Sequence, residues 1–266
     1  MRFSIFKFIF LLQLLLITGC ASLTEEKDET KDWTAKKLYE KAKDALNDRT
    51  YESAIDLYEK LEARYPFGRY AQQAQLDVAY AYYKFDEPDA TIAATERFIR
   101  LHPRHPNIDY AYYLKGLANF NRGITSLMRY TPMDASQRDP GSTKDSFKDF
   151  AILLRKFPKS KYFDDAKQRM VYLRNTLAYH EMNVANYYMG RKAYLAALNR
   201  AKFVVEKYDK TPAVPEALQL MKLAYDKLKM PILAKDTQRV FALNFPNGVP
   251  KKDLKNTIWE YMELDK

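Results

Sequence analysis

Five segments of the chain end in the same way, and their recurrence constrains the fold more than any other feature. Each segment has an apolar residue, a ring-bearing residue four positions later and then a residue that stops a helix. Four of the stops are prolines, which lack a backbone N–H and disfavour helical geometry in the preceding residue. The segments are 61–66, 97–103, 153–158, 204–209 (which stops at Asp209, with Pro212 just beyond) and 241–246. Five such stops in one chain predict a repeated helical unit.

Small residues recur at fixed distances from these stops. An alanine follows each of the first four stops by eight residues, and a small residue precedes each of the five stops by twelve. The alanines are Ala74, Ala111, Ala166 and Ala217, and the preceding small residues are Ala54, Thr91, Ser146, Ala197 and Ala234. Small side chains let two helices pack closely. The sequence therefore predicts an all-α solenoid of about five helix pairs, which resemble tetratricopeptide units.

The N-terminus is typical of an exported lipoprotein. Arg2 and Lys7 precede a short apolar stretch that is too short for a comfortable membrane span. It ends in Ile-Thr-Gly-Cys, which resembles a bacterial lipobox, so we expect a diacylglycerol on the sulfur of Cys20 and an acyl chain such as palmitate on its amino group. By its resemblance to bacterial lipoproteins, a chain with alanine rather than aspartate after this cysteine (Ala21) is expected at the outer membrane, facing the periplasm. The alternative is an ordinary signal peptide followed by a buried cysteine.

The stops and the N-terminal motif together predict how the chain is organised. Turn-rich residues in the first long interval between stops predict a loop, and helix-forming residues within 164–190 predict a lengthened helix. The predicted parts are a signal peptide at 1–19, the lipidated cysteine and a tether at 20–33, repeats at 34–123, the loop at 124–143, repeats at 144–248 and a terminal helix at 249–266.

The predicted terminal helix carries Leu254, Ile258, Tyr261 and Met262 on one face. Such a helix is typical of the cap that ends a solenoid. The alternative is a helix that docks on a partner protein.

No catalytic or metal-binding set of residues emerges from the sequence. His102 and His105 flank prolines at a helix end without a third ligand, and His180 is isolated. The formal charge of +10, or +10 − 2 = +8 without residues 1–19, permits several classes of anionic partner and selects none. We expect a protein that is not an enzyme, holds no cofactor or metal, and does not bind nucleic acid, because its aromatic residues keep the helical-repeat spacing.

The concave surface of a solenoid is lined by the first helix of each pair and suits an extended ligand. We expect a groove for a substrate peptide on that surface, formed by Tyr39, Leu76, Tyr80, Tyr83, Tyr110, Tyr113 and Leu117. Nearby Arg69, Arg97 and Arg100 are candidates to pair with a carboxylate. The alternative is that the apolar residues are core and the arginines a solvated surface.

Several longer runs are more specific than the repeat pattern. Residues 64–71, 79–84, 97–103, 106–110 and 137–140, together with the lipobox, resemble the BamD family of lipoproteins of the β-barrel assembly machine, also described as competence lipoproteins. The resemblance extends from about residue 16 to 246, and residues beyond 250 fall outside it.

This resemblance implies a non-enzymatic scaffold and substrate receptor in the insertion of outer-membrane proteins. Its partners would be the periplasmic repeats of BamA, other lipoproteins of the machine, and unfolded outer-membrane proteins whose C-terminal signal ends in an aromatic residue. The first three units would then bind substrate and the last ones BamA. Arg200, which matches the family, would serve the partner interface or coupling between units; the alternative is an ordinary surface arginine.

A second hypothesis keeps the same fold and anchor. The protein would be another tetratricopeptide lipoprotein of the cell envelope, one that organises cell-wall or division enzymes. A lipid-anchored enzyme is disfavoured, because no nucleophile–base pair or metal set can be assembled from the sequence.

Overall fold

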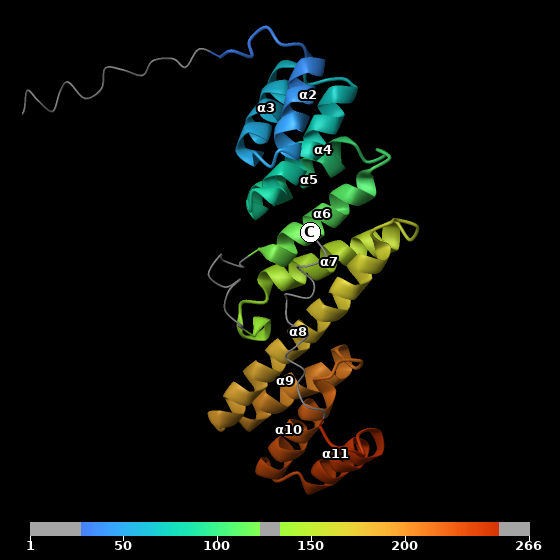
Figure 1. Cartoon of the computed structure of the whole chain (residues 1–266). Helices are drawn as coiled ribbons and strands as arrows, with labels where there is room; N and C mark the ends of the chain where they lie inside the picture. Colours follow the sequence, from blue (N-terminus) through green and yellow to red (C-terminus); the bar gives the residue numbers. More distant parts are fainter. Residues whose placement is uncertain (1–27, 123–133, 250–266) are drawn as a thin grey trace, which may run out of the picture.

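The computed structural model describes residues 28–122 and 134–249, which contain ten α-helices, one short 3-10 helix and no strand. The helices follow one another in an elongated stack from α2 to α11 (Figure 1). The first helices of the pairs are α2 (Ala35–Asn47), α4 (Arg69–Lys84), α6 (Ile108–Asn121), α8 (Phe163–Gly190) and α10 (Val214–Lys227). The second helices are α3 (Tyr51–Arg64), α5 (Pro88–Leu101), α7 (Gly141–Lys156), α9 (Tyr194–Lys207) and α11 (Pro231–Asn244). The predicted all-α solenoid of about five helix pairs is confirmed.

Capping side chains, prolines and ring-bearing residues mark where several of the helices begin and end. The Thr34 hydroxyl accepts a hydrogen bond from the backbone N–H of Lys37 at 3.3 Å and so caps α2. Prolines open α5 and α11, where the missing N–H has no partner in the helix to lose. The residue after α3, α5, α7, α9 and α11 is in each case the ring-bearing residue of the recurring segment.

The small residues predicted to lie between helices are buried. Four of the residues that precede the stops are fully buried and Ala234 is 3% exposed. The four alanines that follow the stops are also fully buried, and each lies in a helix that packs on the helix before it. Close approach of neighbouring helices therefore depends on these positions.

A tight turn connects the two helices in four of the five pairs. Each turn contains one residue with a positive φ between 60° and 67°: Arg49, Asp86, Lys192 or Lys229. This left-handed conformation is the one that glycine adopts most easily, yet none of the four residues is glycine.

The third pair differs, because residues 122–140 connect α6 to α7. The 3-10 helix η3 (Ala135–Gln137) lies in this connection, and α7 begins at Gly141, so the last three residues of the predicted 124–143 loop belong to the helix. Gly116 of α6 permits the contact with α7, since a Cβ atom there would come within 2.5 Å of the Phe150 ring. The Ser146 hydroxyl donates a hydrogen bond to the Gly116 carbonyl at 2.9 Å.

The 28-residue α8 confirms the predicted lengthened helix and joins the two halves of the molecule (Figure 1). Ala166 and Leu173 in its first half pack in a core with α6 and α7. Ala178, Met182 and Ala185 in its second half pack in a separate core with α9 and α10. Cys20, the signal peptide, most of the tether, residues 123–133 and residues 250–266 lie outside the described residues.

Candidate functional site

Half-buried tyrosines line the first helices of the N-terminal units. Tyr39 on α2, Tyr80 and Tyr83 on α4, and Tyr110 on α6 are partly exposed, and together we call them the tyrosine face. The other three residues expected in the groove belong to the core, because Leu76, Tyr113 and Leu117 are only 2%, 8% and 4% exposed. These three residues therefore contribute mainly to packing, although Leu76 also lines the hollow described below.

Asp77 of α4 is the shared hydrogen-bond acceptor at the Tyr39 end of the tyrosine face. Its carboxylate is 8% exposed and accepts hydrogen bonds from the hydroxyls of Tyr39 at 3.0 Å and Tyr58 at 3.3 Å, the Lys43 ammonium at 3.4 Å and the Gln73 amide at 2.8 Å. Burial first, and then the negative charge of Asp77, raise the pKa of both tyrosines, so both stay protonated donors. The role of Asp77 as a shared hydrogen-bond acceptor was not predicted from the sequence.

A hollow of about 450 Å³ lies between α4, α6 and the start of α8, beside the tyrosine face. The Tyr162 ring is 5.4 Å from the Tyr110 ring and stacks on the Tyr113 ring at 4.5 Å. Lys161 also lines the hollow and holds its ammonium 5.0 Å from the Tyr162 ring. The full lining is Gln73, Leu76, Asp77, Pro106, Asn107, Asp109, Tyr110, Lys161 and Tyr162. The hollow combines aromatic walls with one cation, Lys161, and two carboxylates, Asp77 and Asp109, both of which accept hydrogen bonds from neighbouring side chains. The aromatic walls suit an aromatic side chain, and Lys161 can pair with a carboxylate next to it.

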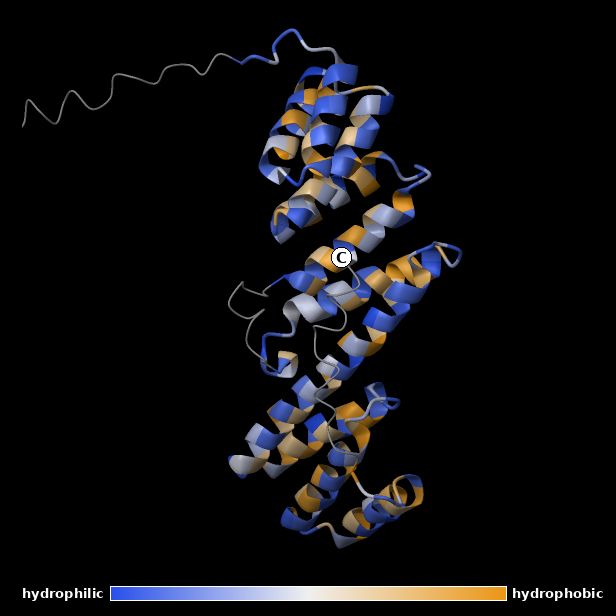
Figure 2. Cartoon of the chain, in the orientation of Figure 1, coloured by the Kyte–Doolittle hydropathy of each residue, from blue (hydrophilic) through white to orange (hydrophobic). Residues whose placement is uncertain are grey.

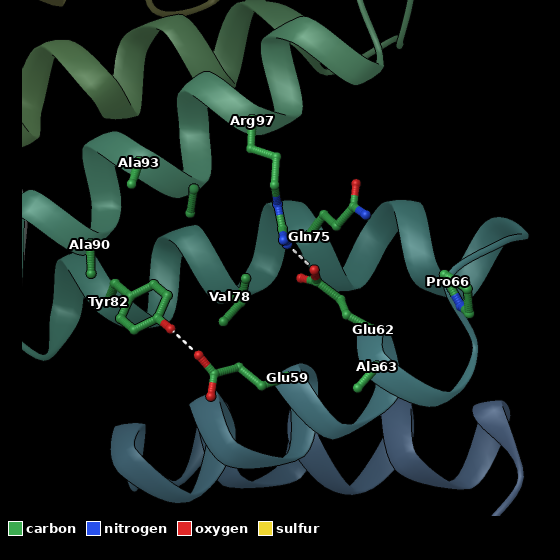
Figure 3. A pocket seen from close by; sticks show the side chains of 11 residues that line it. Glu59, Glu62, Ala63, Pro66, Gln75, Val78, Tyr82, Ala90, Ala93 and Arg97 are labelled. Carbon is green, nitrogen blue, oxygen red and sulfur yellow. Dashed lines mark hydrogen bonds and ion pairs between the residues drawn. The ribbon is translucent and has the colours of Figure 1, made fainter.

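Only one of the three arginines that the sequence suggested lies beside this face. The Arg69 guanidinium is 4.9 Å from the Tyr70 ring, and that ring lies 5.5 Å from the Tyr39 ring. Arg97 is on α5 and forms an ion pair with Glu62 of α3 in another hollow, of about 580 Å³, between α3, α4 and α5 (Figure 3). Arg100 is exposed on α5. Arg97 therefore does not join the tyrosines as expected, because it pairs with Glu62 between α3, α4 and α5.

Arg200 lies on α9 over a buried acid of α8. Its Nη1 donates to Glu181 Oε2 at 2.9 Å, and Glu181 is 7% exposed whereas the Arg200 side chain is 47% exposed. Tyr188, Ala196, Asn199 and Phe203 surround it in a shallow hollow of about 420 Å³. Arg200 therefore pairs with Glu181 inside the protein while part of its side chain stays accessible to a partner.

Exposed apolar side chains gather on the last two second helices, α9 and α11, and Figure 2 shows hydrophobic ribbon along α11 at the end of the stack. We call them the C-terminal outer residues: Leu195, Phe203, Ile232, Leu233, Val240 and Leu243. Ile232 and Leu243 are 77% and 76% exposed. Sequence reasoning missed this set, although alignment of the five units on their stops shows it.

In that alignment the difference from the earlier second helices is clearest at the position of Ile232 and is partial at that of Leu243, where the first unit has Ala63. The positions equivalent to Ile232 hold Glu52, Asp89 and Lys144 in the first three units, and Arg100 and Arg155 are equivalent to Leu243. Exposed apolar groups that gather on one region of a soluble protein mark a binding surface more often than scattered ones do.

The histidines that the sequence considered as metal ligands pack in the protein. The rings of His102 and His105 each lie 5.1 Å from the Phe98 ring, and His102 Nε2 is 2.7 Å from Gln75 Oε1. Within residues 28–122 and 134–249, no helix is both long and apolar enough to cross a bilayer.

Comparison with known proteins gives one consistent result. The family model "YfiO: Outer membrane lipoprotein" matches residues 31–240. The outer membrane protein assembly factor BamD of Neisseria gonorrhoeae is 50% identical over 237 residues, which cover 88% of this chain and 89% of that protein. The factor of the same name from Vibrio cholerae is 37% identical over 88% of this chain and 96% of its own length. The chain belongs to the YfiO family of outer membrane lipoproteins, the family of the assembly factor BamD.

Proposed function

We propose that this protein is a non-catalytic, lipid-anchored assembly factor for outer-membrane β-barrel proteins, and that it works on the periplasmic side of the outer membrane. Its membership in a family whose relatives are named outer membrane protein assembly factors supports the proposal. The solenoid supplies two separate surfaces, the tyrosine face and the C-terminal outer residues, as a scaffold between two partners requires.

The C-terminal outer residues bind the periplasmic repeats of the barrel-forming subunit, BamA. The observation that carries this assignment is the exposure of six apolar side chains on α9 and α11, of which Ile232 stands where the first three second helices have Glu52, Asp89 and Lys144. The cores of protein interfaces are apolar, poor in charged residues and enriched in aromatic residues and arginine, which Phe203 and Arg200 supply side by side on α9. Arg200 extends this surface, and other lipoproteins of the machine bind elsewhere on the solenoid.

The tyrosine face binds the C-terminal segment of unfolded outer-membrane proteins. An aromatic side chain at the end of such a segment fits the hollow beside Tyr110 and Tyr162. Lys161, or Arg69 at the Tyr39 end, then pairs with the terminal carboxylate. These two cations take the role that the sequence suggested for Arg97 and Arg100.

The anchor is the lipidated Cys20, which the tether joins to α2. Cys20→Ala should leave the repeats folded and release the protein from membranes, because the anchor and the solenoid are separate devices. Fractionation of envelopes checks this, with circular dichroism as the control for folding. Recovery of the variant in the membrane pellet after a high-salt wash would count against lipidation.

A pull-down from detergent-solubilised envelopes, followed by mass spectrometry, tests the main function. The tagged, lipidated protein should recover a stoichiometric outer-membrane barrel with periplasmic repeats. Leu243→Glu should lower that recovery by roughly tenfold or more, because it places a charge on the apolar surface. Arg155→Glu, at the equivalent position of α7, is the matched control and should leave recovery unchanged. Cell-wall or division enzymes in place of the barrel would favour the second hypothesis.

A peptide-binding measurement tests the substrate face separately. A fluorescent peptide that ends in phenylalanine should bind the full chain more tightly than the same peptide ending in serine. Lys161→Glu should weaken binding of the first peptide about fivefold to tenfold, since it replaces the cation in the hollow by an anion. Lys167→Glu, on the exposed side of α8, makes the same change of charge outside the hollow. Equal losses from the two variants would indicate nonspecific attraction.

A further inference from the structure

Glu62 of α3 is a half-buried acid at a position that is apolar in every other unit. Its side chain is 13% exposed, and it lies four residues before the stop of the first unit. The residues at this position of the other second helices are Ile99, Leu154, Val205 and Ala242. A carboxylate in place of an apolar side chain costs stability unless donors surround it, so its presence in one unit alone needs an explanation.

The ion pair of Glu62 uses one of its two carboxylate oxygens. Arg97 of α5 pairs with Oε2, whereas Oε1 is buried and accepts no hydrogen bond from residues 28–122 and 134–249. A buried carboxylate oxygen without a donor costs free energy, which a donor from a ligand can recover. The Arg97 side chain is 47% exposed, so it can shift to admit such a donor without disturbing the core.

Glu62 lines the hollow of about 580 Å³ between α3, α4 and α5, which we call the α3–α5 hollow (Figure 3). Glu59, one turn before Glu62 on the same face of α3, also lines it and accepts a hydrogen bond from the Tyr82 hydroxyl. Burial, and then this hydrogen bond, raise the pKa of Tyr82, so its hydroxyl stays a donor that orients Glu59. Among the described residues that line the hollow, Arg97 is the one cation beside these two carboxylates.

Two alanines make room for a ligand in the α3–α5 hollow. Ala63 of α3 stands where the other second helices hold Arg100, Arg155, Glu206 and Leu243. Ala93 of α5 stands where the others hold Asp56, Lys148, Asn199 and Asp236. Val78 of α4, which is 3% exposed, forms part of an apolar floor on which the methylene groups of a long side chain can pack.

The hollow suits a basic side chain of a partner protein better than a small free ligand. Ala63, Ala93 and Glu59 are exposed on its rims, so it is open to solvent. Sites for small molecules usually enclose most of the ligand, whereas an open hollow suits a side chain that belongs to a larger surface. One added positive charge would balance the two carboxylates and Arg97. A guanidinium, with five N–H donors in one plane, can bind both carboxylates at the same time.

We propose that the α3–α5 hollow binds an arginine side chain of a partner protein, with the guanidinium on Glu59 and Glu62. The hollow and the tyrosine face lie on opposite sides of α4. Val78 and Tyr82 line the hollow, and Tyr80 of the tyrosine face is two residues from each of them, which is about 200° around a helix. The site therefore goes beyond the proposed function, and a substrate on the tyrosine face would leave it free.

A peptide-binding measurement with the full chain in detergent tests this site. The probe is a fluorescent nonapeptide of alanine and serine with one central arginine, and the reference is the same peptide with citrulline, which has nearly the same shape and no charge. The arginine peptide should bind roughly tenfold more tightly. Glu62→Gln should remove most of that difference. Glu52→Gln, at an exposed position of the same helix, makes the same change outside the hollow and should leave the difference unchanged.

A second variant blocks the hollow without a change of charge. Ala93→Trp fills the space with an indole ring and should weaken binding of the arginine peptide about as much as Glu62→Gln does. Ala93 is exposed, so this substitution should leave the fold intact, and circular dichroism checks the folding of all the variants.

Four outcomes would overturn the proposal. Equal affinity for the arginine and citrulline peptides would mean that the charge is not recognised. An equal loss from Glu52→Gln and Glu62→Gln would indicate general attraction by acidic residues. Full binding to Ala93→Trp would place the peptide elsewhere. Binding of free agmatine as tightly as the arginine peptide would assign the hollow to a small cation. None of these results bears on recovery of the barrel in the pull-down, so failure of this proposal is distinct from failure of the proposed function.

Discussion

The two ends of the solenoid share one backbone plan and differ in what they expose. The outer positions of α5 hold Asp89 and Arg100, whereas the equivalent positions of α11 hold Ile232 and Leu243. The small residues between helices, in contrast, are buried in both halves. Residues between helices are therefore constrained by packing in every unit, and residues on the outer surface are free to differ according to the partner that each end meets.

The two halves also differ in how they bury charge. In the N-terminal half Asp77 accepts hydrogen bonds from two tyrosines, a lysine and a glutamine. In the C-terminal half the buried Glu181 accepts a hydrogen bond from one side chain of the described residues, the exposed Arg200. A buried acid with several donors withstands the loss of one, and a buried acid with one donor does not.

The largest effect should come from filling the space between paired helices. Ala54→Trp in the first unit and Ala197→Trp in the fourth should each destabilise the protein by about 1–3 kcal/mol or more, because both alanines are fully buried. Local hydrogen exchange should show the loss mainly in the half that carries the substitution, since repeat units depend on their neighbours. An unchanged melting temperature in either variant would mean that the helix contact is elsewhere.

A smaller loss of stability is expected when Arg200 is replaced, and it can distinguish a structural role of this residue from a role in binding the partner. Arg200→Ala should destabilise the C-terminal half by about 1–2 kcal/mol, because Glu181 then stays buried without its partner. Glu181→Gln in the same chain should restore most of that stability in urea unfolding. If Arg200 contacts the barrel-forming partner, pull-down recovery should stay low in the double variant. Full recovery would assign Arg200 to internal stability alone.

Glycine substitutions in the tight turns should change the free energy of unfolding by similar amounts in the two halves. Arg49→Gly in the first unit and Lys229→Gly in the fifth should raise the free energy of unfolding by a few tenths to about 1 kcal/mol, because glycine adopts a positive φ without strain. Thermal unfolding of the two variants measures the effect. Destabilisation by both would indicate that the flexibility of glycine in the unfolded chain outweighs the relief of strain.

The smallest effect should be confined to the N-terminal half. Burial, and secondarily the charge of His105, lower the pKa of His102, whereas Phe157, Tyr208 and Phe245 occupy the equivalent positions farther along the chain. Below the usual pKa of about 6.5 the unfolded chain binds this proton more readily than the folded one, so stability falls as pH drops from 7 toward 5. Urea midpoints should fall less over this range in His102→Gln. Parallel pH profiles for the two proteins would contradict the assignment.

The sequence alone determined the local structure of this protein. The recurring stops, the first-turn prolines and the buried small residues specify where helices end and which positions lie between them, because these depend on neighbours in the chain and on helical periodicity. The family could also be inferred from sequence, since runs such as 97–103 and 137–140 are specific in themselves.

Only the tertiary structure decided which faces meet solvent. Tyr110 and Tyr113 are three residues apart on α6, yet the first lines a hollow and the second is core. Arg97 points to Glu62 and away from the tyrosine face, and Asp77 gains its donors from α2, α3 and α4. Helical periodicity gives the angle of a side chain around its own helix. Whether that side chain is exposed depends on where the neighbouring helices lie, and their positions result from the packing of many side chains at once.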